Sequence, residues 1–554
     1  MMNRPDNNNS NATIIRGGLI ADGSGGALYA GDILIRGSLI EAVETPGRLD
    51  AAIHTPGAAN AAVNAEVIDT GGKIVCPGFI DMHRHHDIAV FNEGFGDIEI
   101  KQGITSCFAG NCGMAPVPNV PAFKAQLQNY LSPCLGPFDS INATYSFSTH
   151  REYLEQLQKI PLPLNMGFYA GMGAIKIAVK GFSAAPFSAD EMKAAQKYLE
   201  EAMDCGAAGL SIGLMYIPEA FGNAKEIAAL ARVMKGRGIL CTHMRWETEN
   251  LVRAVKEVID VAKEAEVPLE ISHFKAAGTK AWHGVLREAI DLIENERADG
   301  MDITVDFYPY DCGSSTMMQM LPPGYLSMGV EEAIAGLNNP VNVEKMRRLL
   351  IEGEEGWDNL SQTIGWDRTI ISSVSLEENK KYLGKNVGAC TQEFGFRDEA
   401  EFIAQLMYGE QGKVAIINQS MSQEDIDTIA RLPYSSLISD ALYGDMKRPH
   451  PRLTGAFPCF LRDFVRDRKI LKLEEAIHKM TSRPAQRLGL SDRGLLKPGY
   501  RADVLVFDPA SFRDKATYLS PTEQAVGLDH VLIGGQQVLI DGKIIRRDAG
   551  QVIR

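Results

Sequence analysis

The 554-residue sequence lacks any long, uninterrupted hydrophobic run. A membrane-spanning helix needs about 20 consecutive apolar residues, so we expect no membrane partner. Residues 1–11 are polar and rich in asparagine, and they lack the apolar core of a secretory signal peptide. These absences together predict a cytoplasmic protein.

The sequence also lacks an excess of positive charge and a regular cysteine spacing. It carries 70 acidic and 56 basic residues, a net charge of −14, whereas proteins that bind polyanions need the opposite balance. We therefore expect no nucleic acid as a partner. The nine cysteines are odd in number and scattered, which indicates free thiols in a reducing compartment and no disulfide framework.

The middle of the chain alternates short strands with helices, one of which is expected over residues 189–202. This alternation is typical of a parallel sheet, and a closed barrel with insertions can use a chain of this length. We expect eight barrel strands, over residues 79–82, 103–109, 165–170, 208–214, 239–242, 268–272, 303–307 and 436–439. The predicted fold class is α/β, a (β/α)₈ TIM-like barrel.

Both ends of the chain read as short strands separated by glycine-containing turns. Neither end could bury a sizeable core alone, so we expect one small composite β domain built from both. The predicted division is 12–73 and 493–554 for the composite β domain and 74–492 for the barrel. A stretch at about 312–414 is too long for a simple loop and contains helical patterns at 343–352 and 398–407. It predicts an inserted lid or interface.

The first barrel strand ends in the sequence Phe-Ile-Asp-Met-His-Arg-His, residues 79–85. Side chains two apart on a strand point the same way, so His83 and His85 can offer two imidazoles to one metal ion. Zinc and related divalent metals accept such ligands. His86 is expected to face the other way and to be structural. The pair alone is a weak signal, because such a spacing also occurs by chance.

Further candidate ligands close other predicted strands, where catalytic residues of such barrels lie. These are Cys112, His243, His273 and Asp440. Each alone could be a packing thiol, a core histidine or a turn residue. Together they predict a hydrolytic metal site, in which Cys112 as a thiolate could bridge two metals and Asp440 could act as the proton-transferring base.

Several motifs make the chain similar to a known family over essentially its whole length. They are Pro-Gly-Phe-Ile-Asp-Met-His-Arg-His at 77–85, Gly-Asn-Cys-Gly at 110–113, Thr-His-Met-Arg at 242–245, Ser-His-Phe-Lys at 272–275, Tyr-Pro-Tyr at 308–310, Ser-Asp at 439–440 and His-Pro-Arg at 450–452. The chain resembles the N-acyl-D-amino-acid deacylases, or D-aminoacylases, of the amidohydrolase superfamily. The Gly-Asn-Cys-Gly and Tyr-Pro-Tyr motifs are the more specific markers.

The resemblance implies zinc-dependent hydrolysis of small N-acyl-D-amino acids, with Asp440 as general acid and base. It implies one tight Zn²⁺ held by Cys112, His243 and His273. It also implies a weaker second metal site formed by His83, His85, the bridging Cys112 and Asp440. The resemblance also implies that the substrate carboxylate is bound by Lys275, Tyr308, Ser314 and Arg452. Cationic side chains can clamp a carboxylate, while a tyrosine hydroxyl polarises the amide.

Three positions depart from the family pattern and leave the preferred side chain and acyl group open. These are Met172 and Trp246, where histidine and an acidic residue are usual, and Ala441, where glycine is usual. The physiological metal, the number of metals and the oligomeric state also stay open, with a homo-oligomer among the options.

Other functions compete with this hypothesis. A cyclic amidase of the hydantoinase or dihydroorotase type would bridge its metals with a carboxylated lysine on strand four. The predicted strand 208–214 has no lysine, and Lys176 and Lys180 follow strand three. A D-aminoacyl or isoaspartyl dipeptidase is a further alternative. A non-catalytic barrel scaffold is a remote one, because such a protein is expected to lose ligands or the base.

Overall fold

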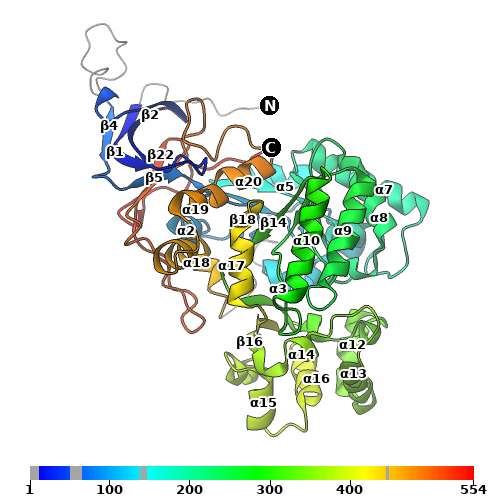
Figure 1. Cartoon of the computed structure of the whole chain (residues 1–554). Coiled ribbons are helices and arrows are strands. Elements are labelled where there is room, and N and C mark those ends of the chain that lie inside the picture. The colour runs from blue at the N-terminus through cyan, green and yellow to red at the C-terminus, as the bar shows by residue number, and fades with distance from the viewer. Residues whose placement is uncertain (1–11, 50–64, 137, 139–145, 444–447) are drawn as a thin grey trace.

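The computed structural model describes residues 12–49, 65–136, 138, 146–443 and 448–554; residues 1–11, which the sequence marks as polar, lie outside this description. Figure 1 shows a β sheet at one end, an α/β barrel in the middle and an inserted helical region projecting from the barrel. Within these ranges no helix has the length and apolar character to cross a bilayer. All nine cysteines are buried and free, whereas the cytoplasmic location stays a prediction.

The barrel has eight parallel strands, and each pairs with the next along the chain. They are β6 (Phe79–Asp81), β8 (Ile104–Ala109), β9 (Asn165–Phe168) continued by β10 (Ala170–Gly171), β11 (Gly209–Gly213), β12 (Ile239–His243), β13 (Leu269–Ile271), β14 (Ile303–Phe307) and β18 (Ser435–Leu437). The ring closes where β19 (Ala441–Leu442), beyond strand eight, pairs in parallel with β7 (Arg84–His85), beyond strand one. The predicted (β/α)₈ barrel is therefore confirmed.

Helices cover the outside of the barrel because each has one apolar face. In α9 (Leu251–Ala265) the buried residues recur at helical spacing, and they include Leu251, Ala254, Val255, Val258 and Ile259. The helix predicted at 189–202 is α7 (Ala189–Asp204), which begins with a capping box between Ser188 and Glu191. Figure 1 shows α8 (Ala224–Ala231), α9 and α10 (Gly284–Ala298) side by side along the barrel.

A nine-stranded sheet joins the two ends of the chain, in the order β23-β22-β21-β20-β5-β1-β2-β3 with β4 also on β1. The strands from the first part are β1 (Ala12–Ile20), β2 (Tyr29–Arg36), β3 (Leu39–Glu44), β4 (Glu66–Asp69) and β5 (Ile74–Pro77). Those from the last part are β20 (Val504–Phe507), β21 (Leu528–Ile533), β22 (Gln536–Ile540) and β23 (Lys543–Ile544). Antiparallel pairing of β20 with β5 makes the junction. This pairing confirms the composite sheet. The domain boundaries stay a prediction, and β5 begins just after the predicted boundary at residue 73.

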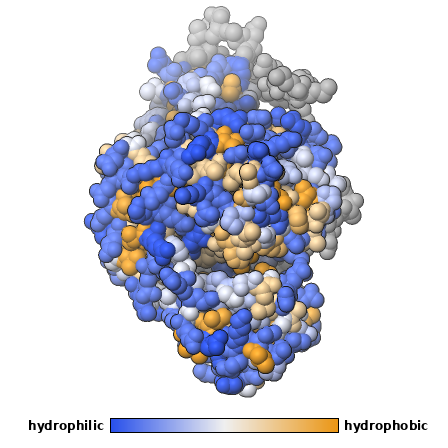
Figure 2. All heavy atoms as spheres, turned by 90° about the vertical axis from the view of Figure 1, so that its right-hand side faces the viewer, coloured by the Kyte–Doolittle hydropathy of each residue, from blue (hydrophilic) through white to orange (hydrophobic). Residues whose placement is uncertain are grey.

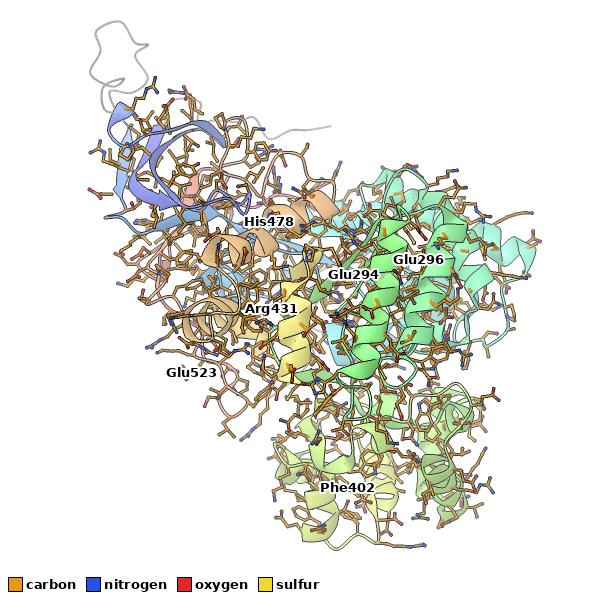
Figure 3. The ribbon with its side chains drawn as sticks, viewed as in Figure 1. Glu294, Glu296, Phe402, Arg431, His478 and Glu523 are labelled. Atoms are coloured by element: carbon orange, nitrogen blue, oxygen red, sulfur yellow. The ribbon has the colours of Figure 1, made fainter. Side chains whose placement is uncertain are left out.

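The predicted insertion is a compact lobe with its own small sheet, in the order β15-β17-β16. Its strands are β15 (Cys312–Thr316), β16 (Thr369–Ser373) and β17 (Ala415–Gln419), so the lobe extends beyond the predicted end at residue 414. The two predicted helices are present as α13 (Pro340–Glu352) and α16 (Glu399–Gly409). Phe402, fully buried in α16, lies within this lobe and away from the barrel (Figure 3).

Candidate metal centre

All six side chains that the sequence marks as metal ligands meet at the carboxyl ends of the barrel strands. His83 is central, because its Nε2 lies 3.3 Å from Cys112 Sγ and 3.4 Å from Asp440 Oδ1. His85 Nε2 lies 3.3 Å from the same Asp440 oxygen. Residues from strands one, two and eight thus offer a nitrogen, a sulfur and a carboxylate to the same small space.

His273 and His243 complete the cluster on its other side. His273 Nε2 lies 3.5 Å from Cys112 Sγ, and the His243 and His273 rings have their centroids 4.4 Å apart. Among the described residues the ligand atoms form three close groups, namely His83 with Cys112 and His273, His83 with His85 and Asp440, and His243 with Glu247 and His273. The division into one tight and one weaker site stays a prediction.

Three of these residues have left-handed backbone conformations, in which only glycine is unstrained. The φ angles are 53° at Cys112, 35° at His273 and 49° at Asp440. Such a conformation costs about 1–3 kcal/mol and persists only where neighbouring contacts enforce it. Here the Asp440 N–H donates to the His83 carbonyl over 3.0 Å, and the His273 N–H donates to Asp306. The strained turns occur where the strands end and the site begins.

A buried arginine anchors the other face of the first strand. Arg84 stands between His83 and His85, so its side chain points away from the cluster. Its guanidinium donates to Glu99 and to the Tyr443 hydroxyl, both over 2.8 Å. These contacts tie strand one to the segment after strand eight and fix the two histidines in place.

His86 does not join the cluster, as the sequence predicts. Its Nε2 lies 3.2 Å from Cys107 Sγ, and its ring stacks on Phe95. Its role is therefore structural.

Two buried carboxylates support the histidines, and the sequence reasoning missed both. Glu247 Oε1 lies 3.2 Å from His273 Nδ1, and Asp306 Oδ2 lies 3.6 Å from His83 Nδ1. A carboxylate at hydrogen-bond distance, such as that of Glu247, can orient a ligating imidazole and raise its basicity; Asp306 instead accepts from the His273 backbone N–H. The available signals were the placement of Glu247 four residues after His243 and of Asp306 near the end of strand seven.

The donor atoms of the cluster fit a divalent metal. Burial lowers the pKa of His83 to about 4 and also lowers the pKa values of His85, His243 and His273, so the imidazoles are neutral and keep a lone pair. Within the described residues, His83 Nδ1, His85 Nδ1 and both His243 nitrogens have no hydrogen-bond partner. Burial raises the pKa of the Cys112 thiol, so its thiolate needs a nearby cation. Nitrogen, sulfur and carboxylate donors together suit zinc.

The residues predicted to bind the substrate carboxylate surround the same cluster. Lys275, Tyr308 and Ser314 line its pocket. Lys275 Nζ contacts Glu247 Oε1 over 2.6 Å. The guanidinium of Arg452 lies 4.7 Å from the Tyr308 ring centroid.

Arg452 also pairs with the proposed base, since its Nη1 lies 2.9 Å from Asp440 Oδ2. Burial alone would raise the pKa of Asp440. The Arg452 charge, aided by His85 and His83, instead holds it well below the usual range. Asp440 is therefore ionised, as a proton acceptor must be.

Neither Lys176, as a bridging lysine, nor His450, as the base, is placed to replace the residues assigned to these roles. Among the described residues, the Lys176 ammonium has no hydrogen-bond partner and lies 5.7 Å from the Phe187 ring centroid, outside the ligand groups. His450 accepts from the Arg452 N–H at Nδ1, and its Nε2 lies 3.0 Å from the Cys312 carbonyl. It is therefore not free to act as the base.

The three departures from the family pattern occupy different places. Met172 and Ala441 are fully buried in the barrel. The Trp246 indole N–H donates to the Gly356 carbonyl over 2.6 Å and so connects the barrel to the insertion.

Comparisons with known proteins agree with this geometry. The sequence profile of the amidohydrolase family matches residues 409–539. Together with the barrel fold and the cluster of candidate ligands, this match defines the class of the protein as an amidohydrolase. The chain is 31% identical to a D-aminoacylase of Alcaligenes xylosoxydans xylosoxydans, over 98% of this chain and 97% of that protein. It is also 31% identical to an N-acyl-D-glutamate deacylase of the same organism, over 97% and 96%. The chain belongs to the D-aminoacylase family.

Solved structures show the same relationship. An N-acyl-D-glutamate deacylase from Bordetella bronchiseptica, complexed with zinc and a phosphonate inhibitor, matches with a TM-score of 0.78 and 28% identity over 98% of this chain and 99% of that one. A D-aminoacylase matches with a TM-score of 0.77 and 30% identity over the same shares. A dihydropyrimidinase from Brevibacillus agri, at a TM-score of 0.55 and 13% identity over 98% of each chain, shares the fold alone.

Proposed function

We propose that the protein hydrolyses the amide bond of N-acyl-D-amino acids in a zinc-dependent reaction, giving a carboxylate and a free D-amino acid. The observation that carries the proposal is the buried cluster of six donor side chains with two cationic side chains, Lys275 and Arg452, beside it. The relatives that match nearly the whole chain are named as D-aminoacylase and as N-acyl-D-aspartate and N-acyl-D-glutamate deacylases.

Cys112, His243 and His273 would hold a tight zinc, and His83, His85 and Asp440 a weaker second metal with Cys112 between them. When bound, zinc supplies Lewis-acid activation of water and of the amide carbonyl. Asp440 accepts the proton of the attacking water and then returns it to the nitrogen of the leaving amine. Its ionised state and its place between His83 and His85 suit both steps.

The substrate carboxylate is bound by the cationic side of the pocket. The Arg452 Nε and the Ser314 hydroxyl are both buried and lack a hydrogen-bond partner in the described part of the chain. They can therefore donate to the substrate carboxylate without losing an existing hydrogen bond. Lys275 adds charge, and the Tyr308 hydroxyl can polarise the amide. An anchored carboxylate positions the scissile bond over the ligand cluster.

The experiment compares chelator-stripped and zinc-loaded protein, with metal content measured on the same samples. It follows amine release from the linear substrates and, by chromatography, formation of the N-carbamoyl amino acid from the hydantoin. The substrates are N-acetyl-D-leucine, its C-terminal amide and a five-membered hydantoin. We expect zinc-dependent release from N-acetyl-D-leucine, a much lower rate on the amide, and no ring opening. Hydantoin hydrolysis with no release from N-acetyl-D-leucine would support a cyclic amidase instead.

A further inference from the structure

A large cavity adjoins the pocket that contains the ligand cluster. The pocket itself has a volume of about 60 Å³. The cavity beside it measures about 850 Å³. The two spaces share part of their walls, namely Met114, Cys134, Met215, Tyr216, Gln319 and Leu360. The pocket and the cavity are therefore immediate neighbours.

The cavity lies between barrel loops and the insertion, and its walls are mainly apolar. Figure 2 shows the surface hollowed between these two parts, with hydrophobic residues beside the hollow. Phe221 and Trp246 line the cavity from the barrel side, and Met318, Leu326 and Ile334 line it from the insertion. Pockets that bury most of a drug-sized ligand have volumes of about 300–1,000 Å³, so this cavity is large enough for a substantial part of a substrate.

The charges around the cavity disfavour an anionic occupant. Four carboxylates line it, those of Glu331, Glu354, Glu355 and Asp358. The cations that line it are Arg245 and Lys413. Arg245 is already neutralised, because its guanidinium binds both carboxylate oxygens of Glu257 over 3.0 and 3.2 Å. A neutral hydrocarbon fits these walls, whereas a second carboxylate on the substrate does not.

The connectivity of the substrate decides which of its parts enters the cavity. The carboxylate and the amino-acid side chain are both attached to Cα, on the amine side of the scissile bond, and the acyl group lies on the other side. The cavity wall contains none of the four described residues that are assigned to the carboxylate, Lys275, Tyr308, Ser314 and Arg452. We propose that the cavity holds the acyl chain, so that the protein prefers N-acyl-D-amino acids with a long, apolar acyl group; this inference rests on the deacylase function proposed above.

A chain-length series on the zinc-loaded wild type tests the inference. The substrates are N-acetyl-, N-butanoyl-, N-hexanoyl- and N-octanoyl-D-leucine, and the measured quantity is kcat/KM. Burial of one methylene contributes about 0.8 kcal/mol, which corresponds to roughly fourfold in kcat/KM per methylene. Octanoyl has six methylenes more than acetyl, and burial of about three of them would raise kcat/KM by the at least ~30-fold that we expect.

Two substitutions place the effect in the cavity. Met318→Glu adds a charge to the half-buried wall, and Ala335→Trp reduces the free volume. Each should lower the octanoyl-to-acetyl ratio of kcat/KM at least tenfold, whereas the volume-conserving Met318→Leu should retain the ratio.

The outcomes separate the two proposals. Hydrolysis of N-acetyl-D-leucine with a flat or falling chain-length series would overturn the acyl-chain site alone. Hydrolysis of none of the four substrates would overturn the deacylase function and, with it, this inference.

Discussion

The pocket around the ligand cluster and the cavity beside it are built in different ways. The pocket is small, and its candidate ligands come from the ends of barrel strands, three of them with strained backbones. The cavity is large and apolar, and the insertion supplies much of its wall. We infer that side chains at the ends of the barrel strands carry the chemistry, whereas the cavity between barrel and insertion selects the acyl group. Variants of each part should therefore change different measured quantities.

The largest effect is expected at the shared thiol of the pocket. Cys112→Ala removes the sulfur that lies within 3.5 Å of both His83 and His273, so the protein should lose tightly bound metal and activity together. Metal content by mass spectrometry and amine release measure the two. Cys390→Ala, a buried thiol in the insertion, is the matched control and should retain both. Retention of metal by Cys112→Ala would make this thiol a packing residue.

Asp440→Asn separates chemistry from metal binding within the pocket. Asparagine has nearly the same shape but cannot accept a proton, so kcat should fall by about 10²- to 10⁴-fold. The tight metal and substrate binding should remain, as judged by metal content and by KM. Loss of the tight metal would show a structural role, and near-full turnover would require another base.

Glu247→Gln tests the support behind the ligands. The Glu247 carboxylate lies 3.2 Å from His273 Nδ1, and loss of such a partner typically weakens metal affinity about 10- to 100-fold. A competitive chelator titration measures the change. The exposed Glu249, two residues further on, provides the control Glu249→Gln, which should bind metal like the wild type. Equal affinities for the two variants would contradict the orienting role of Glu247.

The smallest effect is expected at the junction of barrel and insertion. Trp246→Phe keeps an aromatic wall but removes the hydrogen bond to the Gly356 carbonyl, which should cost about 1 kcal/mol of unfolding free energy. Denaturant unfolding measures the loss. Metal content should not change, because Trp246 lines the cavity and not the pocket. A change in metal content would contradict the division of roles between the two spaces.

The sequence could bring the candidate ligands together because they follow a local rule, and their metal-binding roles stay a prediction. His83 and His85 share one side of a strand, and Cys112, His243 and Asp440 stand where strands end, so strand prediction alone brings them to one edge of the barrel. Glu247 and Asp306 were missed for the opposite reason. Glu247 follows His243 by only four residues, a common spacing, whereas Asp306 lies 33 residues from His273, and only the folded geometry brings either carboxylate to a histidine.

The cavity could not be predicted from the sequence. Its walls combine barrel loops such as 214–221 with insertion residues such as Met318 and Ile334, about one hundred positions away. No periodicity or motif records how two such segments face each other. The sequence marked Trp246 as a departure from the family pattern, but its contact with Gly356 required the structure.

The most direct test of the account is hydrolysis of two enantiomers by the same zinc-loaded sample. Amine release from N-acetyl-D-leucine and N-acetyl-L-leucine is followed at equal concentrations, with a chelator-treated aliquot as the blank. The account predicts zinc-dependent release from the D-enantiomer and little or none from the L-enantiomer. Release from neither substrate, or preferential release from the L-enantiomer, would contradict it.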